Sequence, residues 1–217
     1  MVIGPGPEEL AAGLPAALFE RADDGDDADF YAGPRLVTHI DDATIAALTD
    51  FYRECLPPGG RILDLMSSWI SHLPADVAYG RVTGHGMNAV ELDANARLDE
   101  RLVQDLNRDP RLPFAEGAFD AVLICVSVQY LVRPVALFRE LARVLAPAGQ
   151  LVVSMSHRCF PTKAVRAFQA LTPMQRSQLV MEYVRGAGGF AEPEFHDRSP
   201  ADADPLWIVR AQRLASP

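Results

Sequence analysis

The stretch RILDLMSSWISHLP, residues 61–74, decides how the rest of the chain is interpreted. The PPGG run at 57–60 ends whatever precedes it, and a nearly continuous apolar run around one acid, Asp64, follows. Such a run is typical of a parallel strand covered on both faces. In doubly wound α/β folds the loop after the first strand approaches the ligand, and glycines let backbone amides come close. Here residues 66–70 read MSSWI, so we expect a bulkier loop, with two hydroxyls where amides would normally face open space.

The composition is that of an ordinary globular protein. With 217 residues, of which 49% are hydrophobic and 23% charged, one α/β core can account for the whole chain. No apolar run approaches the roughly 18 to 20 residues that cross a bilayer, and the start MVIGPGPEEL lacks the basic residues of a secretory signal. We therefore expect a single cytoplasmic domain over residues 1–217 and no membrane partner. The three cysteines form no CxxC pair, which favours neither a disulfide framework nor a zinc site, so no metal is expected.

The net charge of −9 is concentrated near the amino terminus. Residues 1–60 hold 12 acidic and 3 basic residues, whereas residues 61–217 hold 17 of each. Binding to the phosphate backbone of nucleic acids generally needs a basic face, so we expect no nucleic-acid partner. We interpret residues 1–56 as an acidic amino-terminal cap, which is either a solvated tether or a lid over a ligand cleft.

Apolar periodicity alternates between helices and strands along the rest of the chain. Helices are expected near residues 44–55, 134–145 and 162–184, with short helical pieces near 74–79 and 88–97. Strands are expected near residues 62–66, 81–86, 101–106, 120–128 and 151–155, with a hairpin-like pair near 190–196 and 206–211. Strands that alternate with helices and end in such a pair predict a doubly wound, mostly parallel sheet with an antiparallel edge.

One segment resembles a known family. Residues 111–155, RLPFAEGAFDAVLICVSVQYLVRPVALFRELARVLAPAGQLVVSM, resemble the middle of the class I S-adenosylmethionine-dependent methyltransferases of the type-11 kind, through their LPF, FDAV and PAG spacings. The resemblance covers residues 61–155, roughly half the chain, and returns weakly in the GGF and LWIVRAQR segments near the end. It implies a Rossmann-like, seven-stranded sheet with the order 3-2-1-4-5-7-6 and strand 7 antiparallel. It also implies S-adenosyl-L-methionine as the cofactor.

Three positions match cofactor contacts of that family. Asp64 matches the acid near the amino end of the cofactor, and Asp105 matches the acid that faces the adenine amino group. Leu106 matches the backbone neighbour that contacts the adenine ring. The resemblance therefore implies a cofactor site at the ends of the first three strands.

Two other cofactor contacts of the family are absent. The glycine-rich loop falls on residues 66–70, none of which is glycine, and the acid that holds the ribose hydroxyls falls on Gly86. Ser67, Ser68 and Asn88 are expected to replace some of the lost hydrogen bonds. Met87 is expected to pack against adenine in the family's manner.

Methyl transfer needs few protein groups, because the sulfonium methyl is already activated and the protein mainly aligns the reacting atoms. His157, in the SHRCF segment after the fifth strand, and Tyr130 are the candidates for a base or an orienting group. Lys163 is a second cation that, with Arg158, could hold an anionic substrate. The candidate substrate-binding residues are Tyr31, Arg35, His39, Gln129 and Arg158.

We therefore predict an S-adenosylmethionine-dependent methyltransferase that acts on a small molecule. One alternative is an enzyme that transfers or cyclises the aminocarboxypropyl arm of the same cofactor, because an altered loop can re-aim that arm. Another is a non-catalytic binding protein in which Met66, Trp69 and Ile70 fill the cofactor pocket. A dinucleotide oxidoreductase and a serine hydrolase are disfavoured, because no GxGxxG follows Leu65 and no GxSxG occurs.

Overall fold

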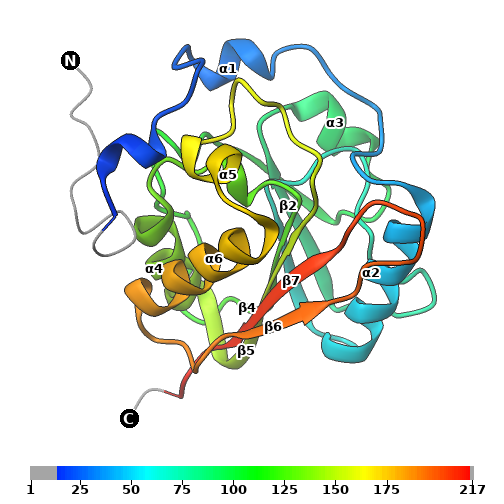
Figure 1. Ribbon diagram of the computed structural model, residues 1–217. Helices are drawn as coiled ribbons and strands as arrows, with labels where there is room; N and C mark the ends of the chain where they lie inside the picture. The colour runs from blue at the N-terminus through cyan, green and yellow to red at the C-terminus, as the bar shows by residue number, and fades with distance from the viewer. Residues whose placement is uncertain (1–13, 216–217) are drawn as a thin grey trace.

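The strand that the opening stretch predicts, β1, lies inside a seven-stranded sheet (Figure 1). In this computed structural model, which describes residues 14–215, the order is β3-β2-β1-β4-β5-β7-β6. β1 to β5 pair in parallel, and β7 pairs antiparallel with both β5 and β6. The strands are β1 Arg61–Leu65, β2 Arg81–Gly86, β3 Glu100–Val103, β4 Phe119–Cys125, β5 Leu145–Met155, β6 Glu194–Asp197 and β7 Trp207–Gln212. The predicted doubly wound sheet, its order and the antiparallel seventh strand are confirmed.

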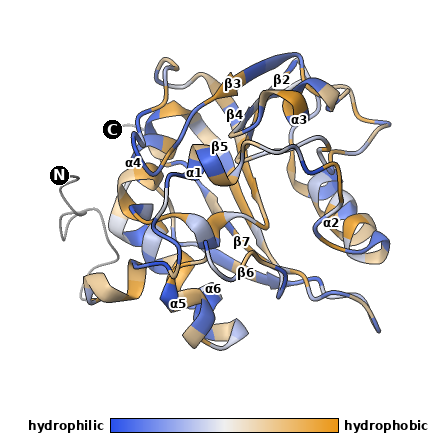
Figure 2. Cartoon of the chain, turned by 90° about the horizontal axis from the view of Figure 1, so that it is seen from above, coloured by the Kyte–Doolittle hydropathy of each residue, from blue (hydrophilic) through white to orange (hydrophobic). Residues whose placement is uncertain are grey.

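Helices cover both faces of the sheet, so alternate strand residues enter two separate cores. Figure 2, seen from above, shows hydrophobic strands between the helices of the two faces. Ile62 and Leu123 pack in the core that α2 and α3 cover, whereas Leu63 and Ile124 pack in the core under α4 and α6. The helices are η2 Ala16–Phe19, α1 Asp27–Phe30, α2 Asp42–Cys55, α3 Ala89–Ala94, η3 Val128–Tyr130, α4 Pro134–Val144, α5 Arg166–Ala170 and α6 Pro173–Ala187.

Two of these helices begin where side chains cap them. Asp41 accepts a hydrogen bond from the Thr44 amide at 2.9 Å and so caps α2, as the sequence predicts. Thr172 and Gln175 form a capping box at the start of α6. That box divides the predicted helical excursion at 162–184 into α5 and α6.

The crossover between β1 and β2 contains no helix, so the helical piece predicted near 74–79 is wrong. Its carbonyl groups are instead held by a distant side chain, because the Arg97 guanidinium donates to the carbonyls of Pro74 at 3.0 Å and Val77 at 2.5 Å. β3 is likewise shorter than predicted. It ends at Val103, and the Asp105 carboxylate then accepts the amides of residues 107 and 108 in a tight turn.

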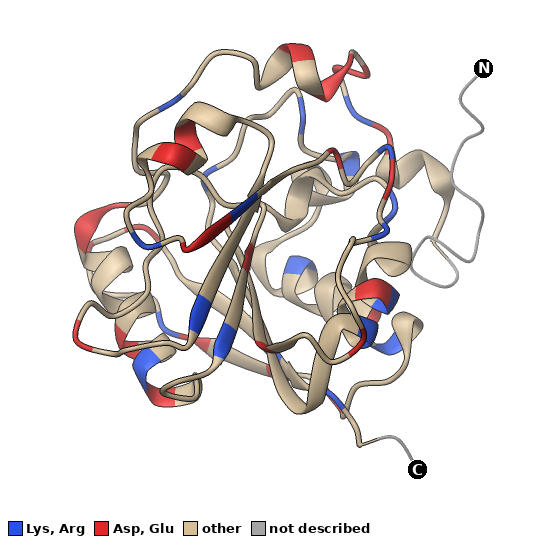
Figure 3. Ribbon diagram, turned by 180° about the vertical axis from the view of Figure 1, so that it is seen from behind, with Lys and Arg blue, Asp and Glu red and all other residues tan. Residues whose placement is uncertain are grey.

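The segment 27–40 crosses the carboxyl ends of the strands (Figure 1). It contains α1 and leads into α2. The first thirteen residues of the predicted acidic cap lie outside the described residues, so its interpretation as a lid stays a prediction. Seen from behind, Lys and Arg are scattered and interleaved with Asp and Glu (Figure 3). Between residues 14 and 215, no helix combines the length and the apolar character needed to cross a membrane.

Candidate functional site

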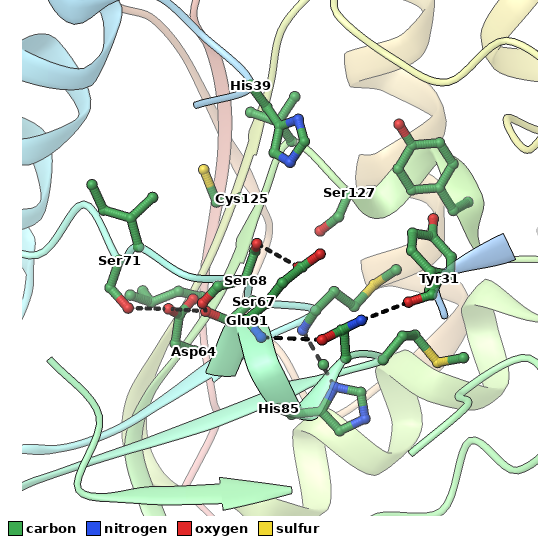
Figure 4. A pocket seen from close by; sticks show the side chains of 18 of the residues that line it. Tyr31, His39, Asp64, Ser67, Ser68, Ser71, His85, Glu91, Cys125 and Ser127 are labelled. Atoms are coloured by element: carbon green, nitrogen blue, oxygen red, sulfur yellow. Dashed lines mark hydrogen bonds between the residues drawn. The ribbon is translucent and has the colours of Figure 1, made fainter. Parts of the chain in front are cut away.

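A cavity of about 320 Å³ lies at the carboxyl ends of β1, β2 and β4 (Figure 4). This is the edge at which doubly wound sheets bind ligands, and the volume lies within the range of small-molecule sites. Arg35, Gln129 and His157 lie outside its lining. The predicted site residues that do line it are Tyr31, His39, Asp64, Ser67, Ser68, Met87, Asn88, Asp105, Leu106, Tyr130 and Arg158.

The first two backbone amides of the loop after β1 are bonded to His85 of β2. Met66 adopts a left-handed φ of 56°, and its amide donates to His85 Nδ1 at 3.4 Å. The Ser67 amide donates to the His85 carbonyl at 2.6 Å. A Cβ atom at Gly86 would lie 2.5 Å from the Ser67 carbonyl oxygen. The missing loop glycines and the missing acid at the end of β2 therefore belong to one rearrangement, in which the loop leans onto β2.

The hydroxyls of this loop already have partners within the protein. Ser67 donates to Asp64 Oδ2 at 2.7 Å, and Ser71 donates to the same oxygen. Ser68 donates to Glu91 Oε2 at 2.6 Å. The expectation that both serine hydroxyls point to open space is therefore corrected, because two carboxylates engage them. Their oxygens still line the cavity and can accept hydrogen bonds there, so their role in cofactor binding stays a prediction.

Asp64 is a buried carboxylate, 5% exposed, at the end of β1. Burial raises the pKa of its carboxyl group, and the hydrogen bonds from Ser71 and Ser67 act in the opposite direction. The loop and this carboxylate are thus one hydrogen-bonded unit. Asn95 extends the unit, since its amide nitrogen donates to the Ser68 carbonyl at 2.9 Å and to the Ser71 hydroxyl at 3.1 Å.

The turn after β3 is held by local bonds at Asp105 and by longer-range bonds at Asn107. Asp105 Oδ1 accepts the amides of Asn107 at 2.8 Å and Arg108 at 3.3 Å, and Leu106 is buried. Asn107 joins this turn to two other segments, because its side-chain nitrogen donates to Asp27 Oδ2 at 2.9 Å and to the Tyr130 carbonyl at 3.0 Å.

Side chains of the site form hydrogen bonds to the segment 27–40, which lies over the cavity and is called the cover. The Asn88 amide nitrogen donates to the Tyr31 carbonyl at 2.9 Å, and the Trp69 indole donates to the Val37 carbonyl at 2.9 Å. Glu91 Oε1 accepts the Arg35 amide at 2.7 Å. Trp69 therefore binds the cover and does not fill the cavity. It is not among the residues that line the cavity.

Several buried polar atoms in the cavity wall have no hydrogen-bond partner among residues 14–215, and they include His72 Nδ1, His85 Nε2 and Ser127 Oγ. Burial lowers the pKa of His72 and of His85 to about 4, and His39 adds to the effect at His72. Both rings are therefore neutral at pH 7. Because His85 Nδ1 accepts a hydrogen bond, its proton lies on the unpartnered Nε2. Buried polar groups without partners are rare, so this wall fits a polar ligand such as the expected cofactor.

The two predicted catalytic residues lie in different surroundings. Burial raises the pKa of Tyr130 to about 12, and its hydroxyl oxygen accepts the Phe160 amide at 2.8 Å. Tyr130 can thus donate a hydrogen bond near neutral pH but is a poor base. His157 is half exposed outside the cavity, with Nε2 3.1 Å from Asp204 Oδ1. Gln129 donates to the Val126 carbonyl at 2.8 Å, so its amide fastens the β4 loop.

Sequence reasoning missed a larger polar set in the cavity wall. One member had a detectable signal, because Asn88 with Glu91 three residues later is an amino-terminal capping pattern that places Glu91 on the first turn of α3. The others lack any local pattern. The missed polar and aromatic lining residues are Asp27, Thr38, Tyr52, Ser71, His72, His85, Glu91, Gln104, Asn107, Cys125, Ser127, Cys159 and Phe160.

Comparisons with known proteins agree with this architecture. The model of a methyltransferase-domain family matches residues 68–153. A demethylmenaquinone methyltransferase of Mycobacterium sp. (strain KMS) is 34% identical over 119 residues, which are 52% of this chain and 47% of that protein. A second relative of that name, from Mycobacterium sp. (strain JLS), is 46% identical over 61 residues, 28% of this chain and 25% of that protein. The chain thus matches these curated relatives over about half of their length or less.

Solved structures share the fold at low identity. The [4+2]-cyclase SpnF is similar with a TM-score of 0.60 and 19% identity, over 87% of this chain and 92% of that chain. An S-adenosylmethionine-dependent methyltransferase from Mesorhizobium loti is similar with a TM-score of 0.54 and 18% identity, over 77% of this chain and 98% of that chain. The methyltransferase-domain match at residues 68–153 and the strand order of the sheet thus agree, and they make this chain similar to the class I S-adenosylmethionine-dependent methyltransferases.

Proposed function

We propose that this chain transfers the methyl group of S-adenosyl-L-methionine to a small molecule held in the cavity. The observation that carries the proposal is a cavity at the ligand-binding edge of the family's sheet, whose wall contains buried polar atoms without partners. The methyltransferase-domain match and the relatives named demethylmenaquinone methyltransferase support it. The cytoplasmic location stays a prediction.

The cofactor would lie along the wall formed by β1, β2 and β3, and it would supply an activated methyl group. Asp105 and Leu106 would contact its adenine end, while Asp64 would lie near its amino end with Ser67 and Ser68. Met87 and Asn88 line the cavity between these two groups in the sheet order. The Asn88 side chain is bonded to the cover, and the amides of Met66 and Ser67 are bonded to β2. We therefore expect side-chain oxygens, rather than these amides, to make the main contacts with the cofactor.

The substrate would lie beyond the end of β4, under the cover. Tyr31, His39 and Arg158 line that side, and Tyr130 can donate a hydrogen bond there. His72 is neutral and its Nδ1 has no partner among the described residues, so it can accept a hydrogen bond from a substrate hydroxyl. These groups would orient the acceptor atom, and the cover would exclude water from it.

The test is calorimetric titration of the protein with S-adenosyl-L-homocysteine, the demethylated form of the cofactor. We expect saturable binding with one site per chain, and a rise in the melting temperature when the ligand is present. Mass analysis of S-adenosyl-L-methionine after incubation with candidate acceptors should then show the demethylated product. A protein that gives neither heat nor a thermal shift at millimolar ligand would contradict the proposal.

A second candidate is a reaction on this fold other than methyl transfer. The first two amides of the loop after β1 are bonded to β2, and the similar structure of SpnF is named as a cyclase. The same mass analysis separates the candidates. Transfer of the aminocarboxypropyl arm would release 5′-methylthioadenosine, whereas a cyclase would leave the cofactor unchanged while its substrate rearranges. A binding protein would change neither molecule.

A further inference from the structure

Arg158 is the single cation among the described residues that line the cavity. The same wall carries four carboxylates, and each of them already accepts hydrogen bonds from hydroxyls, amides or cations of the protein: Asp27, Asp64, Glu91 and Asp105. These carboxylates therefore do not need a cationic ligand to satisfy their hydrogen-bonding capacity. An anionic group of a ligand would find its one cationic partner of this described lining in Arg158.

The Arg158 side chain is held along one edge only. Its Nε donates to both carboxylate oxygens of Asp204, at 3.1 and 3.0 Å. Asp204 is 5% exposed and is fixed in turn by Asp41, whose amide donates to it at 3.1 Å. The Asp204 amide donates back to Asp41 Oδ2 at 2.6 Å. The two terminal nitrogens of Arg158 have no hydrogen-bond partner within residues 14–215, so a fixed guanidinium presents a free pair of donors.

The two other cations considered for this site lie outside the cavity lining and make contacts elsewhere, although Arg35 Nη1 has no hydrogen-bond partner among the described residues. Arg35 Nη2 donates to the Phe30 carbonyl at 2.8 Å, and its guanidinium carbon lies 4.6 Å from the centroid of the Phe30 ring. Lys163 is buried, and its Nζ lies 3.1 Å from Asp27 Oδ1 and 2.9 Å from the Gly25 carbonyl. Neither residue lines the cavity, so an anion there would meet Arg158.

Four of the ring-bearing residues that line the same cavity as Arg158 pack together. The Phe160 ring stacks on Tyr130, with centroids 5.9 Å apart and planes inclined by 26°. Tyr31 and His39 meet the same Phe160 ring edge-on, at 6.5 and 5.7 Å. All four rings line the cavity, and Phe160 follows Arg158 by two residues. A flat apolar ligand would find ring faces and edges here.

We infer that the acceptor substrate of the proposed methyl transfer is an aromatic carboxylic acid. Its carboxylate would pair with the two terminal nitrogens of Arg158, the bidentate geometry for which a guanidinium is suited. Its ring would pack among Tyr31, Tyr130 and Phe160. Asp204 acts as a positioning residue, since it fixes the guanidinium without reaching the ligand. The role of this acid as a substrate rests on the proposed function, but the preference for binding an aromatic acid can be measured separately.

The experiment compares a matched pair of probes, 4-hydroxybenzoate and 4-hydroxybenzamide, by calorimetry on the free protein and on protein saturated with S-adenosyl-L-homocysteine. We expect the acid to bind roughly tenfold or more tightly than the amide, because a charge-assisted pair replaces neutral hydrogen bonds. Arg158→Gln should abolish this ratio, and Arg158→Lys should keep part of it. The control is Arg166→Gln, an exposed arginine paired with Glu20 at 3.1 Å outside the cavity, which should leave the ratio unchanged.

The variant Asp204→Asn tests whether Asp204 positions Arg158, and the readout is again the ratio of the affinities for the acid and the amide. A purely structural loss would weaken the acid and the amide alike, whereas loss of positioning should weaken the acid alone. Melting temperatures of all variants show whether each is folded.

Equal binding of the two probes by the parent protein, or no binding of either, would overturn the inference. So would a variant Arg158→Gln that binds S-adenosyl-L-homocysteine more weakly while its affinity for 5′-methylthioadenosine, which lacks the carboxylate, is unchanged. In that case Arg158 holds the carboxylate of the cofactor. A parent that discriminates between the probes but does not bind S-adenosyl-L-homocysteine would refute the proposed function and leave the Arg158 preference standing.

Discussion

The loop after β1 and the turn after β3 line the same cavity, but the carboxylates beside them, Asp64 and Asp105, are bonded differently. In the first, residues 66–71, amides and hydroxyls bond to residues of β2 and α3 and to the buried Asp64. In the second, Asp105 accepts two amides from residues 107 and 108, within three positions of itself. Long-range polar contacts tie a site to the stability of the fold, whereas a local turn leaves site chemistry nearly independent of it. Substitutions in these two regions should therefore behave differently.

The largest expected effect is that of Asp64→Ala. Removal of this buried carboxylate deprives the half-buried hydroxyls of Ser67 and Ser71 of their acceptor, and each hydrogen bond to a charged group contributes about 1.5 to 3 kcal/mol. Part of that loss returns because the cost of burying a charge disappears, so we expect a decrease in the free energy of unfolding of about 2 to 4 kcal/mol. Urea unfolding followed by circular dichroism measures it.

The matched control is Asp50→Ala in α2, where an exposed carboxylate bonds to the Arg53 guanidinium, which also bonds to Asp76. It removes a hydrogen bond without burying an unpaired group, so the free energy of unfolding should change by less than about 1 kcal/mol. An Asp64→Ala protein that unfolds at the same urea concentration as this control would show that the loop after β1 is not tied to the fold.

The next effect depends on pH and involves His85, the β2 residue that accepts the loop amides. An unfolded histidine has a pKa of about 6.5, whereas burial lowers the pKa of folded His85 to about 4. Between these values the unfolded chain binds more protons, so stability falls as the pH decreases, by roughly 1.4 kcal/mol for each pH unit. Between pH 7 and pH 4, the free energy of unfolding of the His85→Gln variant should therefore fall by about 3 kcal/mol less than that of the parent protein.

Melting temperatures measured from pH 7 down to pH 4 test this slope. His72 has the same direction and size of pKa shift, so His85→Gln should reduce the slope without abolishing it, and the double variant with His72→Gln should reduce it further. A His85→Gln profile parallel to that of the parent protein would contradict the buried neutral state of His85.

The sheet was predictable because its signals are local. Apolar runs such as the one around Leu63 contain the alternation that fills two cores, and the residues on either side of each run end it. The piece at 74–79 failed for the opposite reason. Its carbonyls are bonded by Arg97, some twenty residues later in the chain, and no pattern within six residues indicates this contact.

The same distinction between local signals and long-range contacts explains which site residues could be predicted. Asp105 and Leu106 follow a strand directly, so position alone brings them to the cavity. Asn107 and His85 were missed because their importance comes from partners that only the folded sheet brings close. Ser67 and Ser68 were placed correctly in the cavity wall, but their hydrogen-bond partners, Asp64 and Glu91, could not be named from spacing.

The smallest effect on stability should come from Asp105→Ala, in the turn after β3. The carboxylate bonds two amides at a partly exposed position, and water can replace it there, so the free energy of unfolding should fall by about 1 kcal/mol or less. If the cofactor binds as proposed, loss of one hydrogen bond to the adenine amino group should weaken the affinity for S-adenosyl-L-homocysteine by roughly 1 to 3 kcal/mol. The variant should thus separate binding from stability, which no substitution at Asp64 can do.

The control for this variant lies four residues further along. Asp109 makes the same kind of local turn, since its Oδ1 accepts the Arg111 amide at 2.9 Å, but it does not line the cavity. Asp109→Ala should therefore match Asp105→Ala in urea unfolding and match the parent protein in calorimetry. If both variants kept the affinity of the parent, Asp105 would have no contact with the cofactor, and the turn after β3 would serve only to connect β3 to the rest of the sheet. If Asp105→Ala instead unfolded as early as Asp64→Ala, the contrast between the locally bonded Asp105 and the cross-linked loop after β1 would be wrong.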